Sequence, residues 1–128
     1  AHICNNLGYW GAGFVVAVSK RWPAAEKKYR QLESYELGRT QFVQVEEGIW
    51  VANMIAQRGI RSQKNPVPLS YEHLDKCLMD LAEFAKVRQV TVHMPKIGCG
   101  LAGGKWVVVE SRISKILKDV DTYVYELQ

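Results

Sequence analysis

Residues Lys96–Trp106 read KIGCGLAGGKW, and this glycine-rich stretch decides the fold class. It follows a strand-like run at 90–94 and precedes a helix-like run that begins near Trp106. Four of the ten glycines of the chain lie within residues 98–104. Successive backbone N–H groups in such a turn can form a concave nest for an anion, and the following helix adds its positive N-terminal end. The stretch therefore predicts a phosphate-binding loop between a strand and a helix.

A second glycine-bearing loop, residues 5–14, follows the short apolar segment Ala1–Cys4 and precedes another helix-like run. In open α/β sheets, ligands bind outside the carboxyl ends of the strands. Two such loops on neighbouring strands would hold the two phosphates of a diphosphate. A tight turn without a ligand is the alternative for either loop alone.

In the rest of the chain, segments with the hydrophobic periodicity of helices alternate with segments typical of strands. Helices are expected in four segments, 14–20, 24–32, 70–85 with Ser70 as N-cap, and 106–118. Strands are expected in four segments, 41–45, 49–57, 90–94 and 122–125. A hairpin turn is expected at 46–48 and a loop at 58–68. This order predicts a single α/β domain whose central mixed, mainly parallel sheet is flanked by helices.

Composition narrows the class of protein. A chain of 128 residues is long enough for one domain with its own core. No apolar run approaches the roughly 18 residues of a membrane span. The three cysteines form no CxxC pair and their number is odd, which favours a reducing, cytoplasmic setting. The three histidines show no ligand spacing with them, so neither a metal site nor a cofactor is expected.

Other chemistry is weaker in the sequence. Residues 98–103 match G-x-G-x-x-G but lack the context of a dinucleotide-binding unit, and no P-loop motif is present. Cys99 could act as a nucleophile, with His93 upstream as its base. The favoured alternative is that the Cys99 side chain is turned into the core and takes no part in catalysis. His2 and His93 are expected to be strand histidines that are satisfied by their neighbours. The net charge of +4 includes Arg58, Arg61, Lys64 and the segment 20–28, which could serve nucleic acid but are more simply a solvated surface.

The two loops, AHICNNLGYWGAGF and MPKIGCGLAGGKW, resemble those of the macrodomain family of ADP-ribose-binding modules. The resemblance extends from Ala1 to the final strand TYVYEL, and it implies a three-layer fold for one domain, 1–128. MPKIGCGL and VYEL look closest to the branch that holds the terminal ADP-ribose protein glycohydrolase and a chromatin-remodeller macrodomain. The family's usual first strand lies upstream of Ala1, so the domain is expected to lack its first N-terminal strand or strands.

The resemblance also implies roles for individual residues. Asn5 and Asn6 would lie near the distal ribose. The remaining implied ligand-binding residues are Gly11, Ala12, Gly13 and Phe14 in the first loop, Ile97, Gly98, Cys99, Gly100, Leu101 and Ala102 at the diphosphate, and Tyr125 and Leu127 at the adenine.

The function implied is binding of ADP-ribose or of ADP-ribosylated protein, with no membrane partner and with nucleic acid not favoured. The catalytic lysine and aspartate of the related glycohydrolase align with Gln57 and Ala102, which cannot act as nucleophile and base. That mechanism is therefore expected to be absent, and the sequence does not identify a catalytic residue. The alternative is a hydrolase of an ADP-ribosyl ester or of ADP-ribose 1''-phosphate, in which the substrate aligns an attacking water.

Overall fold

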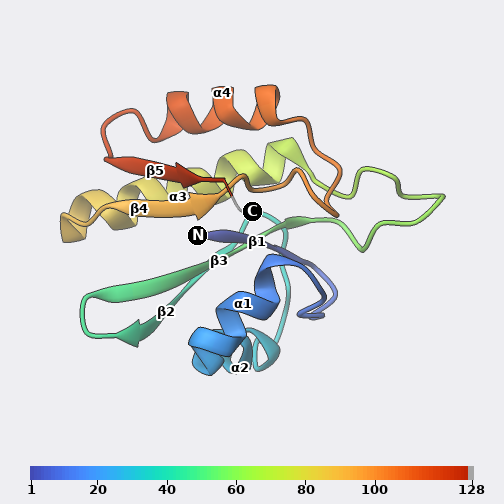
Figure 1. Ribbon diagram of the computed structural model, residues 1–128, viewed down its shortest axis with the longest axis horizontal. Coiled ribbons are helices and arrows are strands. Elements are labelled where there is room, and N and C mark those ends of the chain that lie inside the picture. Colours follow the sequence, from blue (N-terminus) through green and yellow to red (C-terminus); the bar gives the residue numbers. More distant parts are fainter. Residues whose placement is uncertain (127–128) are drawn as a thin grey trace.

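Strands and helices alternate along the computed structural model, which describes residues 1–126 (Figure 1). The strands are β1 (His2–Asn5), β2 (Thr40–Glu46), β3 (Ile49–Gln57), β4 (Val92–Pro95) and β5 (Thr122–Tyr125). The helices are α1 (Phe14–Arg21), α2 (Pro23–Arg30), α3 (Tyr71–Arg88) and α4 (Trp106–Ile116). Among the described residues no helix has the length and apolar character that a membrane crossing requires.

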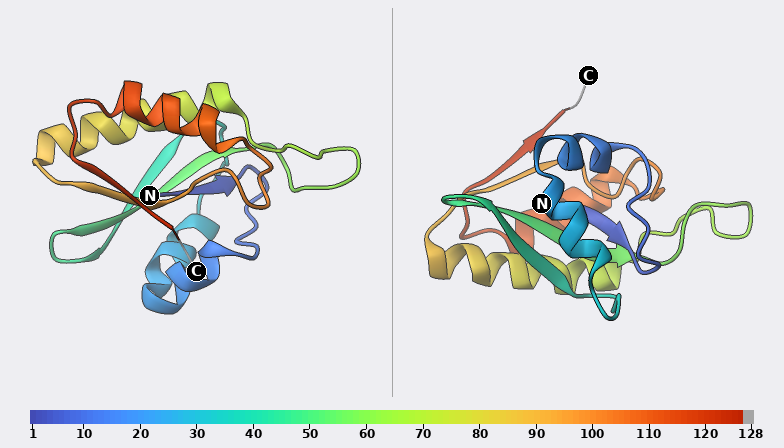
Figure 2. Two further views of the ribbon diagram at one scale, coloured as in Figure 1. Left: turned by 45° about the horizontal axis from the view of Figure 1, so that its top comes forward. Right: turned by 90° about the horizontal axis from the view of Figure 1, so that it is seen from below.

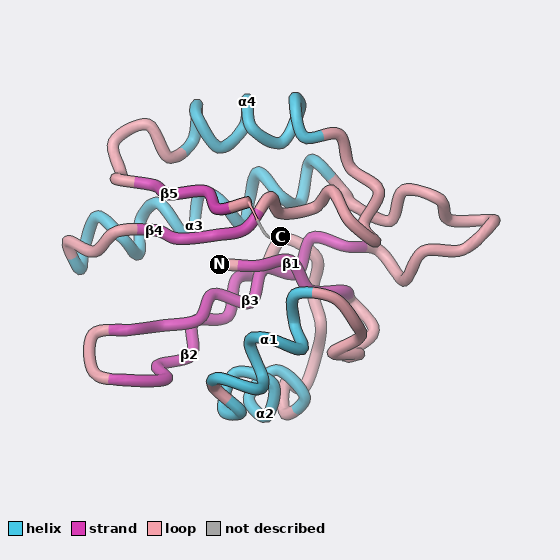
Figure 3. The backbone as a smooth tube through the Cα atoms, in the orientation of Figure 1, coloured by secondary structure: helices cyan, strands magenta, loops and turns pink. Residues whose placement is uncertain are grey.

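The strands form two hydrogen-bonded groups, β1-β3-β2 and β4-β5. β1 runs parallel to β3, β4 runs parallel to β5, and only the β2–β3 hairpin is antiparallel. β4 lies beside β1 (Figures 1 and 3), where the amino group of Ala1 donates a hydrogen bond to the carbonyl oxygen of His93 at 2.7 Å. The expectation of a mixed, mainly parallel sheet is confirmed.

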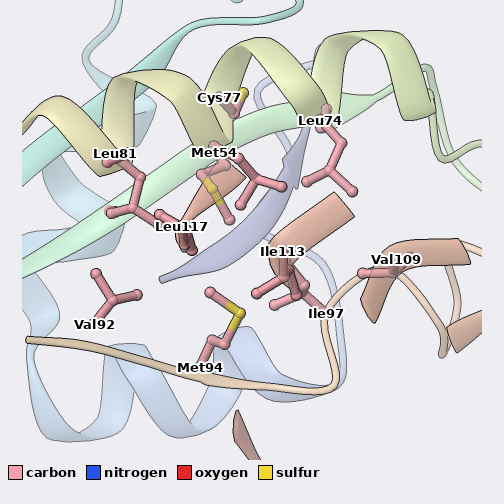
Figure 4. Close-up of a cluster of buried hydrophobic side chains, with 14 of the residues drawn as sticks. Met54, Leu74, Cys77, Leu81, Val92, Met94, Ile97, Val109, Ile113 and Leu117 are labelled. Carbon is pink, nitrogen blue, oxygen red and sulfur yellow. The ribbon is translucent and has the colours of Figure 1, made fainter. Parts of the chain in front are cut away.

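Helices cover both faces of the sheet, with α1 and α2 on one side and α3 and α4 on the other (Figure 2). Residues 51–56 of β3 are all buried, and they alternate between two cores. Val51 and Ile55 pack under α1 and α2, whereas Met54 packs with α3 and α4. Figure 4 shows this larger core, in which Met94 and Ile97 meet side chains of both covering helices. The core therefore fixes β4 and the start of the loop that follows it.

Local signals account for most element boundaries. The Ser70 side chain accepts a hydrogen bond from the amide of His73 and caps α3, as expected. β4 begins at Val92, two residues later than expected, because the amide of Val90 still donates to the carbonyl of Ala85 at the end of α3. α4 ends at Ile116, two residues earlier than expected, and Leu117 is its C-cap.

Candidate functional site

The second glycine loop, residues 97–104, is a tight turn between β4 and α4. Gly98 and Gly103 have φ angles of 75° and 73°, which favour glycine. The amide of Gly104 donates to the carbonyl of Gly98 at 2.7 Å, and the amide of Gly103 donates to that of Gly100 at 3.0 Å. Within residues 1–126, the five successive amides of 98–102 donate no hydrogen bond. The loop therefore presents a row of free N–H donors.

This loop packs against residues 66–69, which precede α3. A Cβ atom on Gly103 would lie 2.7 Å from the carbonyl oxygen of Pro66, and one on Gly98 would lie 2.8 Å from Leu69 Cδ2. The amide of Leu69 also donates to the carbonyl of Ala102 at 3.1 Å. A Cβ atom on Gly100, in contrast, would meet nothing within 4 Å. The glycines at 98 and 103 are required by packing, whereas Gly100 keeps one side of the loop open.

The first glycine loop, residues 5–13, is shaped by the Asn5 side chain. Its Nδ2 donates to the carbonyl of Tyr9 at 2.8 Å, and its Oδ1 accepts from the amides of Leu7 and Tyr9 at 2.9 and 3.2 Å. The Oδ1 of Asn6 accepts from the amide of Gly59 at 2.8 Å. Both side chains hold the backbone in place, and their contact with a ribose stays a prediction.

The end of the first loop opens α1 without a capping side chain. Gly13 is the N-cap with a φ of 82°, and the first turn contains no acidic residue. In the described chain, the amides of residues 11–13 also donate no backbone hydrogen bond. The free amides and the positive end of the helix together favour an anion.

The two loops line one cavity of about 670 Å³. Its lining includes nine of the predicted site residues, Ala12, Gly13, Phe14, Ile97, Gly98, Cys99, Gly100, Leu101 and Ala102. Asn5, Asn6 and Gly11 do not line it, and Leu127 lies outside the described residues. Tyr125 lines a second, mainly apolar cavity of about 770 Å³. The two cavities share His2, Phe14 and Pro95, so they adjoin.

Few ionisable side chains line the first cavity. Burial raises the pKa of the Cys99 thiol, and its Sγ lies 3.4 Å from the carbonyl oxygen of Ile97. Lys96 Nζ pairs with Glu126 Oε1 at 2.6 Å at the exposed rim, and their hydrogen bond raises the pKa of Lys96 and lowers that of Glu126. In the described part of the chain, no cluster of side chains suits a metal ion. The cavity favours binding through backbone amides over attack by a protein nucleophile.

His93, the candidate base for Cys99, is exposed and does not line the first cavity. Its Nδ1 lies 2.8 Å from the Tyr125 hydroxyl and its Nε2 lies 2.8 Å from Thr91 Oγ1. His93 is therefore satisfied by its neighbours, as expected.

His2 departs from the same expectation. Its Nε2 lies 2.5 Å from Asn53 Oδ1, whereas its buried Nδ1 has no hydrogen-bond partner among residues 1–126. Asn53 Nδ2 donates to the carbonyl of Ala25 and to Gln41 Oε1, so Asn53 Oδ1 accepts the proton of His2 Nε2. Burial lowers the pKa of His2 to about 4. No local sequence signal indicates this network, because Asn53 lies 51 residues away.

The chain is similar in sequence and structure to several known proteins. No protein-family model matches the chain. A solved protein of unknown function from Bacteroides thetaiotaomicron is 47% identical over 98% of this chain and 85% of that one, with a TM-score of 0.92. A macrodomain protein from Streptomyces coelicolor is 42% identical over 99% of this chain and 86% of that one, with a TM-score of 0.85. The ADP-ribose 1''-phosphate phosphatase of Candida albicans is 28% identical over 90% of this chain and 79% of that protein. On the strength of its likeness to the Streptomyces protein along almost its whole length, this chain belongs to the macrodomain family.

Proposed function

We propose that this protein binds ADP-ribose, free or attached to another protein, through its diphosphate. One observation carries the proposal. The five free amides of residues 98–102 and the uncapped start of α1 line the same cavity. Two anionic phosphates fit such donors, because the donors are fixed in advance and face no competing partner. The related phosphatase, whose named substrate contains ADP-ribose, supports the choice of ligand.

The adjoining cavities suggest how the rest of the ligand lies. The second cavity is mainly apolar and is lined by Tyr125, Phe14 and Trp22, which suit a flat base. We assign the adenine to this cavity and the diphosphate to the first one. The distal ribose then lies toward Gln57 and Ala102, which also line the first cavity. If the ADP-ribosyl group is attached to another protein, that protein would lie outside this end of the cavity.

A second candidate function is hydrolysis of ADP-ribose 1''-phosphate or of an ADP-ribosyl ester. The named activity of the Candida albicans relative favours it. The Gln57 amide is not nucleophilic, and the raised pKa of Cys99 keeps its thiol protonated near neutral pH. Water is therefore the attacking group, held in line by the bound phosphates. The carboxylate of Glu126 is exposed and already paired with Lys96, so it is a poor base.

Calorimetric titration with ADP-ribose, with AMP as control, tests the proposal. We expect micromolar binding of ADP-ribose and much weaker binding of AMP, because AMP has one phosphate for two loops. Equal binding of the two ligands, or binding of neither, would contradict the diphosphate site. Phosphorus NMR of ADP-ribose 1''-phosphate with the protein then tests for phosphatase activity, since only hydrolysis of this substrate releases inorganic phosphate. Release of ADP-ribose from an ADP-ribosylated glutamate peptide tests for ester hydrolysis.

We also propose a cytoplasmic location. Cys4, Cys77 and Cys99 are all free thiols, and the first two are buried. Unpaired cysteines are typical of proteins in a reducing compartment. Fractionation of the source cells with an antibody to this protein would test the location.

A further inference from the structure

We propose that residues 58–68, here called the basic loop, are a docking surface for an acidic segment of the protein that carries the ADP-ribosyl group. This inference rests on the proposed function, because it concerns what lies beyond the distal ribose. The basic loop connects β3 to α3 and projects from the carboxyl end of β3 (Figures 1 and 2).

The base of the basic loop contacts both glycine loops. Gln57, the residue before it, lines the first cavity. The amide of Gly59 donates to Asn6 Oδ1 in the first loop at 2.8 Å. At the other end, the carbonyl oxygen of Pro66 lies against Gly103 in the second loop. The base of the basic loop therefore lies next to Gln57, at the end of the cavity to which we assign the distal ribose.

The basic loop is held in shape by its own hydrogen bonds. The amide of Arg58 donates to the carbonyl of Pro68 at 2.8 Å, which closes its base. The backbones of Ser62 and Asn65 exchange two hydrogen bonds at 3.1 Å, which closes its tip. Asn65 Nδ2 also donates to the carbonyls of Arg58 and Ile60, at 2.8 and 3.1 Å. Side chains on such a loop are presented in a fixed arrangement, which lowers the entropic cost of binding.

The charge of the basic loop is not compensated. Arg58, Arg61 and Lys64 are exposed, and within residues 1–126 none of them forms an ion pair. No Asp or Glu occurs between Glu47 and Glu72 in the sequence. The glycine loops add none, because residues 1–25 and 84–109 also lack acidic side chains. The one carboxylate among the described lining residues of the first cavity, Glu126, is paired with Lys96. The basic loop and the two glycine loops thus attract an anionic partner.

An acidic peptide fits this surface better than a nucleic acid. Proteins that hold single-stranded nucleic acid combine positive charge with aromatic side chains on which bases stack. Residues 58–70 contain no aromatic residue. They instead expose two aliphatic side chains beside the cations, Ile60 (52%) and Val67 (49%). Carboxylates and aliphatic groups along a peptide match this mixture.

The test compares three ligands by calorimetry at low salt. They are free ADP-ribose, a peptide with one ADP-ribosylserine flanked by glutamates, and the same peptide flanked by glycines and serines. We expect the wild-type protein to prefer the acidic peptide over the neutral one by roughly fivefold, as two exposed ion pairs would give. The variant Arg61→Gln/Lys64→Gln should lose this preference and keep its affinity for free ADP-ribose. The variant Lys27→Gln/Lys28→Gln on α2 has the same change of charge. It should keep both the preference for the acidic peptide and the affinity for free ADP-ribose.

Equal affinity of the wild-type protein for the two peptides would overturn the docking surface. So would a preference that survives Arg61→Gln/Lys64→Gln. If an oligonucleotide of ten thymidines binds the basic loop more tightly than the acidic peptide, and the same variant abolishes that binding, the partner is nucleic acid and the acidic peptide is wrong. Failure of free ADP-ribose to bind the wild-type protein is a separate result, which would overturn the proposed function and this inference with it.

Discussion

The amide nitrogen of Gly104 lies 2.7 Å from the carbonyl oxygen of Gly98, and this hydrogen bond closes the second glycine loop. A Cβ atom on Gly104 would lie 2.5 Å from the same oxygen, and it would also meet the Leu69 side chain. Closure of the loop thus depends on the absence of a side chain at 104. With the ends held together, the amides of residues 98–102 remain free to bind a ligand.

Gly104→Ala should therefore damage both stability and binding. Overpacking against a backbone carbonyl lowers the free energy of unfolding by about 1–3 kcal/mol. Urea unfolding and calorimetry with ADP-ribose measure the two effects. Gly100→Ala is the matched control for stability, because a Cβ atom there meets no described atom within 4 Å. Wild-type stability and affinity in Gly104→Ala would show that the loop is not closed in this way.

Gly100→Glu should strongly weaken ADP-ribose binding in a protein that still folds. The new side chain has room, since Gly100 faces open space, but it brings a carboxylate to the expected position of a phosphate. We expect affinity to fall roughly 30-fold or more, or about 2 kcal/mol. Gly100→Gln adds nearly the same volume without the charge and should lose less. Unchanged affinity in folded Gly100→Glu would rule out a phosphate at this loop.

Cys99 should supply only its backbone amide. Cys99→Ala keeps that amide, so ADP-ribose affinity should stay within about twofold of the wild-type value. Iodoacetamide should label Cys99 before Cys4 and Cys77, because Cys99 is half-buried whereas the other two are buried. Bound ADP-ribose should slow this labelling, as mass spectrometry would show. Loss of binding in Cys99→Ala would mean that the thiol itself acts.

Stability should fall in acid because of His2. Burial lowers its pKa from 6.5 in the unfolded chain to about 4 in the folded protein, so the folded state disfavours the proton. The contribution is complete above about pH 6.5 and is lost as the pH falls toward 4. It amounts to about 3 kcal/mol. His2→Gln is the control, because the glutamine amide can still donate to Asn53 Oδ1 and does not titrate. Urea unfolding at pH 7.5 and 4.5 should show a smaller loss in His2→Gln, and an equal loss would contradict this role.

Much of the fold follows from local chemistry. The turn between β2 and β3, the Ser70 cap and the apolar run of β3 each depend on residues close together in the chain. The cap and the apolar run lie where the sequence predicts them, and the turn, at 47–48, begins one residue later than predicted. The end of α3 does not, because Val90 resembles the strand residues after it and yet its amide bonds to Ala85 in the helix.

In the candidate site, too, some features follow from the local sequence and others depend on contacts between distant residues. The glycine spacing predicts two turns at strand ends, and the structure brings both turns to one cavity. Asn5 and Asn6, at the end of β1, look like ligand contacts in the sequence, whereas the fold gives their side-chain oxygens backbone partners as distant as Gly59. The His2–Asn53 pair and the internal bonds of the basic loop likewise depend on contacts that no local pattern encodes.

The most direct test of the diphosphate site is an NMR titration of the ¹⁵N-labelled protein with ADP-ribose, following each backbone amide. We predict that the amides of residues 98–102 and 11–13 shift most and saturate together, because a phosphate would accept their free hydrogens. Large shifts confined to other residues, with these amides unmoved at saturation, would contradict binding through the two glycine loops.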